Sequence, residues 1–223
     1  MGAYRKGNRQ MTNDEKREKG MLFEPSDAEL KAQKLIAHKL NIEYNTVPED
    51  ETERRDGLIK KLIGQIGDGC FMQGPIYFHY GIHTKIGKAF FANFNFTVQD
   101  DASVTIGDYC NFGPNVTIVT PVHPMIATER RTMLDENGTR KHLCYAKPVV
   151  IGNDCWFGAN VTICGGVTIG DGCVIGAGSV VTENIPDNTF AAGIPCKVIR
   201  YITEKDSMKF KPNVLGYYKI LEE

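Results

Sequence analysis

Apolar residues recur at every sixth position along much of this chain. In the stretch IGNDCWFGANVTICGGVTIGDGCVIGAGSVVTEN, which begins at residue 151, a large apolar residue opens each hexad and a small residue follows four positions later. The large positions are Ile151, Phe157, Ile163, Ile169, Ile175 and Val181, and the small ones are Cys155, Val161, Val167, Cys173 and Ser179. The same register holds earlier, with Ile106, Phe112 and Ile118 at the large position and Cys110 and Val116 at the small one. Such a fixed short period predicts a repeat architecture.

Six residues are too few for a helical repeat, but they suit one short strand and a tight corner, with one large and one small side chain pointing inward. Three such units close a triangular coil, and successive coils stack about 4.8 Å apart through parallel backbone hydrogen bonds. We therefore expect a mainly β protein with a parallel β-helix over residues 65–203, and with glycine and asparagine at its corners. The cysteines at the small position, Cys110, Cys155 and Cys173, are expected to fill the core.

The repeat is interrupted once, between residues 119 and 148. Ile118 and Ile151 are 33 positions apart, which is not a multiple of six, so the chain must leave the coil and return to it. A long loop in a compact repeat fold usually has a function. His123 stands at the root of this loop, between Pro121 and Pro124.

A helical pattern precedes the repeat. Ser26 and Glu29 have the spacing of a capping box, and they predict a helix over about 27–41. The apolar residues expected on its buried face are Leu30, Leu35, Ile36 and Leu40.

A second helix is predicted to begin near Thr46, with Pro48 and acidic residues in its first turn, and to end at Gly64. The two helices would form a helical hairpin over residues 21–64. Residues 1–20 are polar and basic and are expected to be flexible. A C-terminal tail over residues 204–223 completes the predicted organisation.

Composition narrows the class of protein without identifying it. The chain has 223 residues, 42% of them hydrophobic and 24% charged, with a net charge of −1. The chain has no basic stripe that would indicate nucleic-acid binding. It also has no apolar run near the ~20 residues needed to cross a bilayer. The polar N-terminus does not look like a signal peptide. Seven cysteines without a CxxC pair do not suggest a disulfide framework, so we expect a cytoplasmic protein.

Several motifs, spread from about Met11 to Ile202, point to a family. They are LFEPSDAEL, YFHYG, FFANFNFTVQDDASVTIGD, the His-Pro at 123–124, YAKPVVIGNDCWFGANV, VIGAGSVVT and AAGIPCKVIR. Together they resemble the hexapeptide-repeat acyltransferases, and more narrowly the galactoside and maltose O-acetyltransferases. The resemblance implies a left-handed β-helix, a homotrimer and an active site between neighbouring coils, across which the inserted loop reaches. It also implies acetyl-CoA as co-substrate, a small hydroxyl acceptor such as a sugar, and no metal.

The resemblance assigns His123 as a general base that takes the proton of the acceptor hydroxyl, whose oxygen then attacks the thioester of acetyl-CoA directly. An imidazole suits this role because its pKa lies near the working pH. The developing oxyanion needs a donor, and the resemblance places it at the backbone N–H of Ala159.

Further site residues are implied in the same way. The acceptor would contact Asp27, Phe91, Asn93, Asp101 and Cys144, and CoA would contact Trp156, Ala159, Ala177, Thr182, Lys197 and Arg200. Each has a structural alternative. Asn93 and Asp101 could simply form corners, Asp27 could cap a helix, and the two cations could be solvated surface charges. Trp156 precedes the inward Phe157 and is therefore expected to point outward.

The chain departs from its relatives on the acceptor side. Cys144 stands where many sugar acetyltransferases carry glutamate, with His142 nearby, and His79 and His83 replace a small polar residue and an asparagine. These changes do not affect the expected use of CoA. They leave the identity of the acceptor undetermined, so that the acceptor could also be a xenobiotic or an amino compound.

Two other functions remain as alternatives. The γ-type carbonic anhydrases share the coil and bind zinc through three histidines, two of them five residues apart. Five residues to either side of His123 are Ile118 and Thr128, so this spacing is missing. The other alternative is a scaffold without catalysis, against which His123 and the residues on the CoA side argue.

Overall fold

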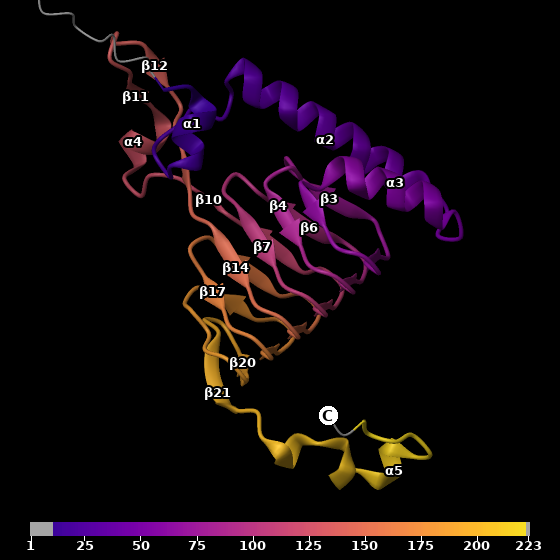
Figure 1. Ribbon diagram of the computed structural model, residues 1–223. Helices are drawn as coiled ribbons and strands as arrows, with labels where there is room; N and C mark the ends of the chain where they lie inside the picture. Colours follow the sequence, from indigo (N-terminus) through magenta and orange to yellow (C-terminus); the bar gives the residue numbers. More distant parts are fainter. Residues whose placement is uncertain (1–10, 222–223) are drawn as a thin grey trace, which may run out of the picture.

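The computed structural model describes residues 11–221 and contains a capped parallel β-helix (Figure 1). Helices near the N-terminus cover one end of the coil, an inserted segment projects from its side, and the C-terminal residues extend from the other end. Residues 1–10, the first half of the segment that is expected to be flexible, lie outside the described part of the chain. None of the helices within that part combines the length and the apolar character needed to span a bilayer.

Three parallel sheets form the faces of the coil. The first sheet contains β1 (Gln65–Ile66), β4 (Thr84–Ile86), β7 (Val104–Ile106), β14 (Val149–Ile151) and β17 (Thr168–Ile169). The second contains β2 (Phe71–Met72), β5 (Phe91–Ala92), β8 (Asn111–Phe112), β15 (Trp156–Phe157), β18 (Val174–Ile175), β20 (Thr189–Ala192) and the antiparallel β21 (Lys197–Tyr201). The third contains β3 (Ile76–Phe78), β6 (Phe96–Gln99), β9 (Thr117–Val119), β16 (Thr162–Cys164) and β19 (Val180–Val181).

The register of these strands places equivalent hexad positions directly above one another. Ile106 pairs with Ile151, and Ile151 pairs with Ile169, so the large positions form one buried column in the first sheet. In the second sheet the tilted rings of Phe112 and Phe157 pack with their centroids 4.4 Å apart. Every large and small position named from the sequence is buried, which confirms the predicted β-helix and its inward columns.

Asparagine forms one corner of the coil, as predicted. Asn95, Asn115 and Asn160 lie in three successive coils with φ near +60°, a conformation that asparagine tolerates better than most residues. Each side chain also bonds to the next, with Nδ2–Oδ1 distances of 2.9 Å between Asn95 and Asn115 and between Asn115 and Asn160. The corner is therefore held by a ladder of amides as well as by the strands.

Helix α2 (Ala28–Thr46) satisfies the free edge of the third sheet. The Asn41 side chain both donates to the Phe78 carbonyl at 2.7 Å and accepts from the Phe78 N–H at 3.1 Å. One turn later, Asn45 makes the same pair of bonds to Ile76, at 2.9 and 2.8 Å. Two amides at positions i and i+4 thus replace the missing neighbouring strand. These contacts explain why α2 continues to Thr46, five residues beyond the predicted end.

The two helices predicted before the coil are present, but their boundaries differ from the prediction. Helix α3 (Thr52–Leu62) begins after Pro48 rather than around it, because α2 occupies the chain as far as Thr46. The N-cap of α2 is Asp27, whose carboxylate accepts from the Glu29 N–H at 3.0 Å, and not Ser26.

The buried face of α2 also differs from the prediction. Leu30 is buried, but Leu35 and Ile36 are 58% and 63% exposed. The helix instead buries Ala37, Asn41 and Tyr44 against the coil. Small and hydrogen-bonding side chains fit this face because it lies directly on strand backbone.

Of residues 1–20, for which the sequence predicts a flexible segment, the described residues 11–20 contain a short helix. Helix α1 (Asn13–Glu18) has a capping box in which the Thr12 hydroxyl accepts from the Glu15 N–H at 3.1 Å. Its Arg17 side chain is buried, with Nη1 donating to the Asp101 carbonyl at 2.9 Å. A long-range contact of this kind is invisible in local composition.

The inserted segment is more ordered than a plain loop. It contains β10 (Pro121–Val122), α4 (Ala127–Arg131), the hairpin β11 (Met133–Leu134) and β12 (Arg140–Lys141), and finally β13 (Tyr145–Ala146). Strands β10 and β13 pair antiparallel at its root. In Figure 1 the segment lies beside α1, and a β-bridge joins Phe23 to Cys144. The N-terminal residues therefore brace the insertion.

The chain ends in an arm that follows β21. It contains η1 (Glu204–Asp206), η2 (Met208–Phe210) and α5 (Pro212–Leu215). Figure 1 shows this arm in yellow, extending away from the end of the coil.

Candidate functional site

The residues singled out from the sequence lie at two different corners of the coil. We call the turn from the third sheet into the first the loop corner, because the inserted segment leaves after β9 and returns before β14; it carries His123, Asp101 and Cys144. We call the turn from the second sheet into the third the tryptophan corner; it carries Asn93 and Ala159. The width of the third sheet separates the two corners within one chain.

His123 is exposed immediately after β10. The pairing of Val122 with Tyr145 fixes the backbone here, and the next step of the same register sets His123 opposite Cys144. The His123 ring lies 5.5 Å from the ring of His142, measured between centroids. No hydrogen bond to a ring nitrogen of His123 is found within residues 11–221, so both ring nitrogens are available to a ligand.

Two adjacent carboxylates at the loop corner have different environments. Asp100 is buried and satisfied, since it accepts from the Tyr80 N–H at 2.8 Å and from the Thr84 hydroxyl at 2.9 Å. Asp101 is 3% exposed, and within residues 11–221 no other residue donates to its carboxylate. Burial raises the pKa of Asp101 to about 6, and Lys34 and Arg17 only partly oppose this shift. Asp100 is thus fully satisfied within the fold, whereas the Asp101 carboxylate has only its own backbone N–H as a donor and keeps unused acceptor capacity.

A small second core lies beneath these carboxylates. Its members are Phe23, Leu30, Tyr80, Ala102, Cys144 and Ala146. Cys144 is only 2% exposed, and burial raises the pKa of its thiol to about 12. The family resemblance implies that Cys144 contacts the acceptor, but its thiol is buried in this apolar core. It therefore cannot contact a ligand without rearrangement of Phe23 and Tyr80.

Two of the histidines singled out from the sequence, His79 and His83, lie near this core. The His79 ring lies 5.6 Å from that of His38 and 5.0 Å from that of Tyr80. Burial lowers the pKa of His79 to about 4, so this imidazole is neutral at neutral pH. His83 donates from Nδ1 to the Asp100 carbonyl at 2.7 Å, and burial lowers its pKa as well. The loop corner therefore contains two half-buried imidazoles whose pKa values lie below the usual one.

A cavity of about 470 Å³ opens beside the loop corner, between the N-terminal segment and the β11–β12 turn. Asp27 lines it, but the Asp27 carboxylate is already bonded to the Glu29 N–H and to Asn13 Nδ2, the latter at 3.1 Å. Across the cavity, Lys141 forms an ion pair with Glu24 at 2.8 Å. Asp27 acts mainly as a helix cap, and any contact with a ligand would use its remaining acceptor capacity.

The tryptophan corner joins exposed aromatic surface to a free backbone donor. Phe91, Asn111 and Trp156 occupy one outward column of the second sheet, and Trp156 is 57% exposed, as the sequence predicted. Just beyond it, the Ala159 N–H makes no hydrogen bond to any described residue, although the Ala159 carbonyl accepts from Gly178. An unpaired N–H beside open surface can bind an anionic oxygen.

Close stacking of the coils creates this geometry. A Cβ at Gly158 would lie 2.6 Å from the Ala177 nitrogen, so only glycine lets the next coil approach. The neighbouring Ala177 is exposed in the following coil, one step along the same corner. Small residues in this row keep the N–H of Ala159 accessible.

The other residues assigned to CoA are more dispersed. Thr182 is exposed just after β19, on the loop-corner side of the third sheet. Lys197 pairs with Glu183 at 2.6 Å, and Arg200 forms a bidentate pair with Asp206 at 2.8 and 2.7 Å. Both cations are therefore already paired with carboxylates of the same chain.

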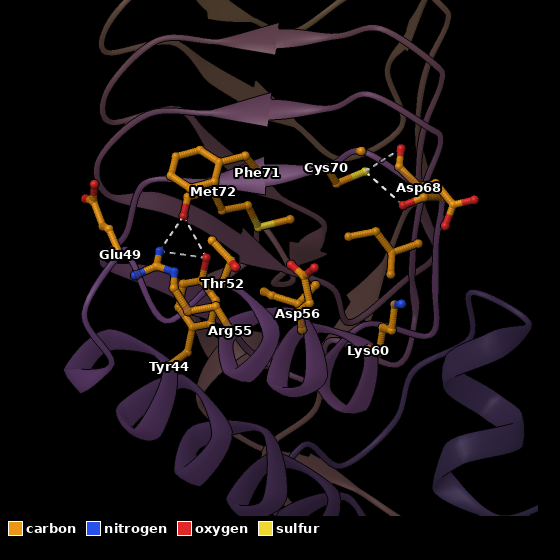
Figure 2. Close-up of a pocket in the computed structure, with 14 residues that line it drawn as sticks. Tyr44, Glu49, Thr52, Arg55, Asp56, Lys60, Asp68, Cys70, Phe71 and Met72 are labelled. Carbon is orange, nitrogen blue, oxygen red and sulfur yellow. Dashed lines mark hydrogen bonds between the residues drawn. The ribbon is translucent and has the colours of Figure 1, made fainter.

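A separate cavity of about 130 Å³ lies under α3 and contains none of the residues assigned from the sequence (Figure 2). Its buried Arg55 donates to the Tyr44 hydroxyl at 2.8 Å and to the carbonyls of Met72 and Gln73 at 2.6 and 3.0 Å. This arginine caps the first coil, and its donors are occupied by that task. No group of three or more His, Cys, Asp or Glu in the described residues could hold a metal ion.

Three side chains near the Asp101 carboxylate, those of Arg17, Lys34 and Tyr80, were not predicted from the sequence. Arg17 and Lys34 lie with their cationic groups 5.9 and 5.7 Å from the Tyr80 ring centroid, and both influence Asp101. The Tyr80 hydroxyl is buried and has no hydrogen-bond partner among the described residues. The repeated aromatic residues of YFHYG were the one available signal, whereas Arg17 and Lys34 come from helices whose packing the sequence does not specify.

Comparison with known proteins gives two family matches that cover separate parts of the chain. Residues 16–67 match the maltose acetyltransferase hexapeptide capping motif, and residues 148–183 match the bacterial transferase hexapeptide with six repeats. Galactoside O-acetyltransferase of Escherichia coli is 43% identical over 187 residues, which are 84% of this chain and 88% of the relative. A putative acetyltransferase of Saccharomyces cerevisiae is 45% identical over 178 residues, 80% of this chain and 86% of the relative.

Solved structures show the same likeness. A galactoside acetyltransferase in complex with coenzyme A superposes with a TM-score of 0.82 at 40% identity, covering 96% of this chain and all of that one. A maltose O-acetyltransferase from Clostridium difficile superposes with a TM-score of 0.78 at 38% identity, covering 88% of this chain and all of that one.

Proposed function

Because this chain belongs to the hexapeptide-repeat acetyltransferases and is an acyltransferase, we propose that it transfers acetyl from acetyl-CoA to a hydroxyl group of a sugar or related small acceptor. The observation that carries the proposal is the unpaired Ala159 N–H beside the exposed Trp156, on a coil whose relatives bind coenzyme A. A thioester held there would have its carbonyl oxygen next to a fixed donor. The exposed imidazole of His123 supplies the second requirement, a base.

The reaction proceeds in one transfer without an acyl-enzyme. Neutral His123 takes the proton of the acceptor hydroxyl while the hydroxyl oxygen bonds to the thioester carbon. The carbonyl oxygen becomes negative and accepts a hydrogen bond from the Ala159 N–H. The tetrahedral intermediate then breaks its carbon–sulfur bond, and the CoA sulfur leaves with the proton that His123 holds. The products are the acetyl ester and free CoA, and His123 is neutral again.

His123 and Ala159 must come from two copies of the chain. They lie at different corners of one coil, with the third sheet between them. A neighbouring copy that sets its tryptophan corner against the loop corner would bring the base, the free N–H and Asn93 together. Closed rings satisfy such an unlike pair of surfaces, and three copies of a triangular coil form the homotrimer that the family resemblance implies.

CoA lies along the tryptophan corner, with its pantetheine arm on Trp156 and beside Ala177. Thr182 lies on the loop-corner side of the third sheet, so it would contact this CoA only from the neighbouring copy. Lys197 and Arg200 can contribute to phosphate binding only by sharing or leaving their carboxylates, Glu183 and Asp206. Paired surface cations of this kind add little, so we assign the larger share of CoA binding to the uncharged corner.

The acceptor binds at the loop corner, against Asp101 and opposite Phe91 and Asn93 of the neighbouring copy. Asp101 accepts a hydroxyl or a protonated amine, since its own backbone N–H is the one donor to its carboxylate within residues 11–221. The neutral His79 and the buried Cys144 make this pocket less polar than a glutamate at position 144 would make it. The acceptors to screen are therefore sugars, amino sugars and less polar alcohols.

Subunit complementation tests the shared site. His123→Ala disables the loop corner and Asn93→Ala the tryptophan corner, so each variant alone should have low activity. Random mixed assemblies should regain up to about a quarter of the sites, because each site draws one corner from each of two chains. Mixing His123→Ala with Asp101→Ala, two lesions of the same corner, is the matched control and should regain none. Absence of recovery in the first mixture would place the whole site within one chain.

A further inference from the structure

The C-terminal arm, residues 203–221, has a defined structure but no visible partner. It consists of η1, η2 and α5, and Figure 1 shows it extending beyond the end of the coil instead of folding back on it. Within the described residues, the last hydrogen bond from the strand region to the coil runs from the Ile202 N–H to the Asn188 carbonyl, at 2.7 Å. Beyond that point, the hydrogen bonds of the arm among residues 11–221 are made within the arm itself and to Arg200.

The arm leaves the coil in a fixed direction. Asp206 accepts both guanidinium nitrogens of Arg200, at 2.8 and 2.7 Å, and also the Thr203 N–H at 2.9 Å. The Arg200 guanidinium in turn lies 5.9 Å from the ring centroid of Phe190 in the last coil. These bonds lower the pKa of Asp206 to about 2, so the pair persists across the physiological pH range. Two parallel charge-assisted bonds define an angle as well as a distance.

The arm is unusually apolar for a segment in water. Phe210, Val214, Tyr217, Tyr218 and Leu221 are 59%, 71%, 105%, 84% and 91% exposed. Its three aromatic side chains alone offer on the order of 500 Å² for burial. That is more than half of the ~800 Å² that one partner contributes to a standard protein interface.

We propose that this arm docks on a second copy of the chain. Its own coil is not the occupant, because the Arg200–Asp206 pair directs the arm away from that coil. A neighbouring copy is already required at the flank of the coil, since the base and the free N–H lie at different corners. An arm that starts at the end of β21 and runs outward meets such a neighbour. Tyrosine and phenylalanine, enriched here, are the side chains that interfaces bury most readily.

A photo-crosslinking residue incorporated at position 217 of the full chain tests the docking directly. Position 53 on α3, which is exposed at the opposite end of the coil, is the matched control for random collision. After irradiation, denaturing electrophoresis separates covalent dimers and trimers from single chains. The expected result is abundant multimers from position 217 and few from position 53. Single chains only, or equal yields from the two positions, would overturn the proposal.

Sedimentation of the same samples distinguishes this proposal from the proposed function, whose self-association it assumes. If the protein sediments as a trimer but gives no crosslinked multimers from position 217, docking of the arm is contradicted and the shared site is not. If the protein sediments as a monomer, both proposals are contradicted. As a second measurement, the variant Tyr217→Ser/Tyr218→Ser should dissociate at a concentration at least tenfold higher than the unmodified chain. Leu35→Ser, which alters an exposed apolar residue on α2, should not. An unchanged dissociation concentration in the double variant would contradict docking through these tyrosines.

Discussion

Replacing Asp101 by asparagine should stabilise the folded chain above neutral pH while damaging acceptor binding. The side chain is 3% exposed and its pKa is raised from 3.8 to about 6, with burial as the main cause. A difference of about 2 units corresponds to ~3 kcal/mol of preference for the neutral form. Asparagine is close in shape and carries no charge, so it avoids this cost.

The sign of the pH dependence follows from the raised pKa. The folded chain holds the Asp101 proton more tightly than the unfolded chain, so this group favours folding most below pH 3.8. Its contribution declines as pH rises through the window between 3.8 and about 6, and the full penalty is present above it. Asp101→Asn should therefore be about 1–3 kcal/mol more stable than the unmodified chain at pH 8, and nearly equal to it near pH 4.

Urea denaturation at pH 4, 6 and 8, at one fixed chain concentration, measures this difference. Asp50→Asn is the control for a surface carboxylate and should change little at any pH. Asp100→Asn should destabilise throughout, because the Asp100 carboxylate accepts from Tyr80 and Thr84. The activity of Asp101→Asn should fall through kcat/KM for the acceptor. If Asp101→Asn were less stable than the unmodified chain by the same amount at pH 4 and pH 8, the carboxylate would be satisfied and the reasoning refuted.

Three further predictions concern the chemistry and the core. His123→Ala should lower kcat at least ~100-fold and leave CoA affinity, measured calorimetrically, unchanged; retention of most activity would remove the base from the mechanism. Titration with CoA should change the emission of Trp156, the only tryptophan, in a saturable way, and binding without any such change would move Trp156 out of the site. Cys173→Ser should lower the free energy of unfolding by roughly 1–3 kcal/mol. The thiol is fully buried and donates to the Pro186 carbonyl at 3.1 Å, and the shorter C–O bond of serine would leave its hydroxyl farther from that carbonyl. Loss of acetyl transfer without a change in melting would contradict its role as core.

The coil was predictable from sequence because its determinants are local and repeated. One large and one small residue per hexad specify each strand and corner, and every named position from Ile106 to Val181 is buried as expected. The helix boundaries were not predictable in this way. Helix α2 ends where Asn41 and Asn45 meet the edge of β3, and nothing in the local sequence of α2 reveals that edge.

The candidate site was predictable in part for the same reason. Trp156 points outward as its place before Phe157 requires, since alternation along a strand is local. Cys144 could not be placed, because its burial depends on Phe23 and Tyr80, which are distant in sequence. The environment of the Asp101 carboxylate, with Arg17 and Lys34 nearby, likewise depends on the packing of α1 and α2 against the loop corner.

The most direct test is identification of the product. The protein is incubated with acetyl-CoA and a panel of galactosides, maltose, amino sugars and apolar alcohols, while thiol release is followed and each acceptor is examined by mass spectrometry. Acceptor-dependent thiol release, together with one acetyl ester per acceptor molecule and loss of both signals in His123→Ala, is the predicted result. Thiol release that no acceptor accelerates, or an acetylated product that forms equally well with His123→Ala, would contradict acetyl transfer by the His123 base.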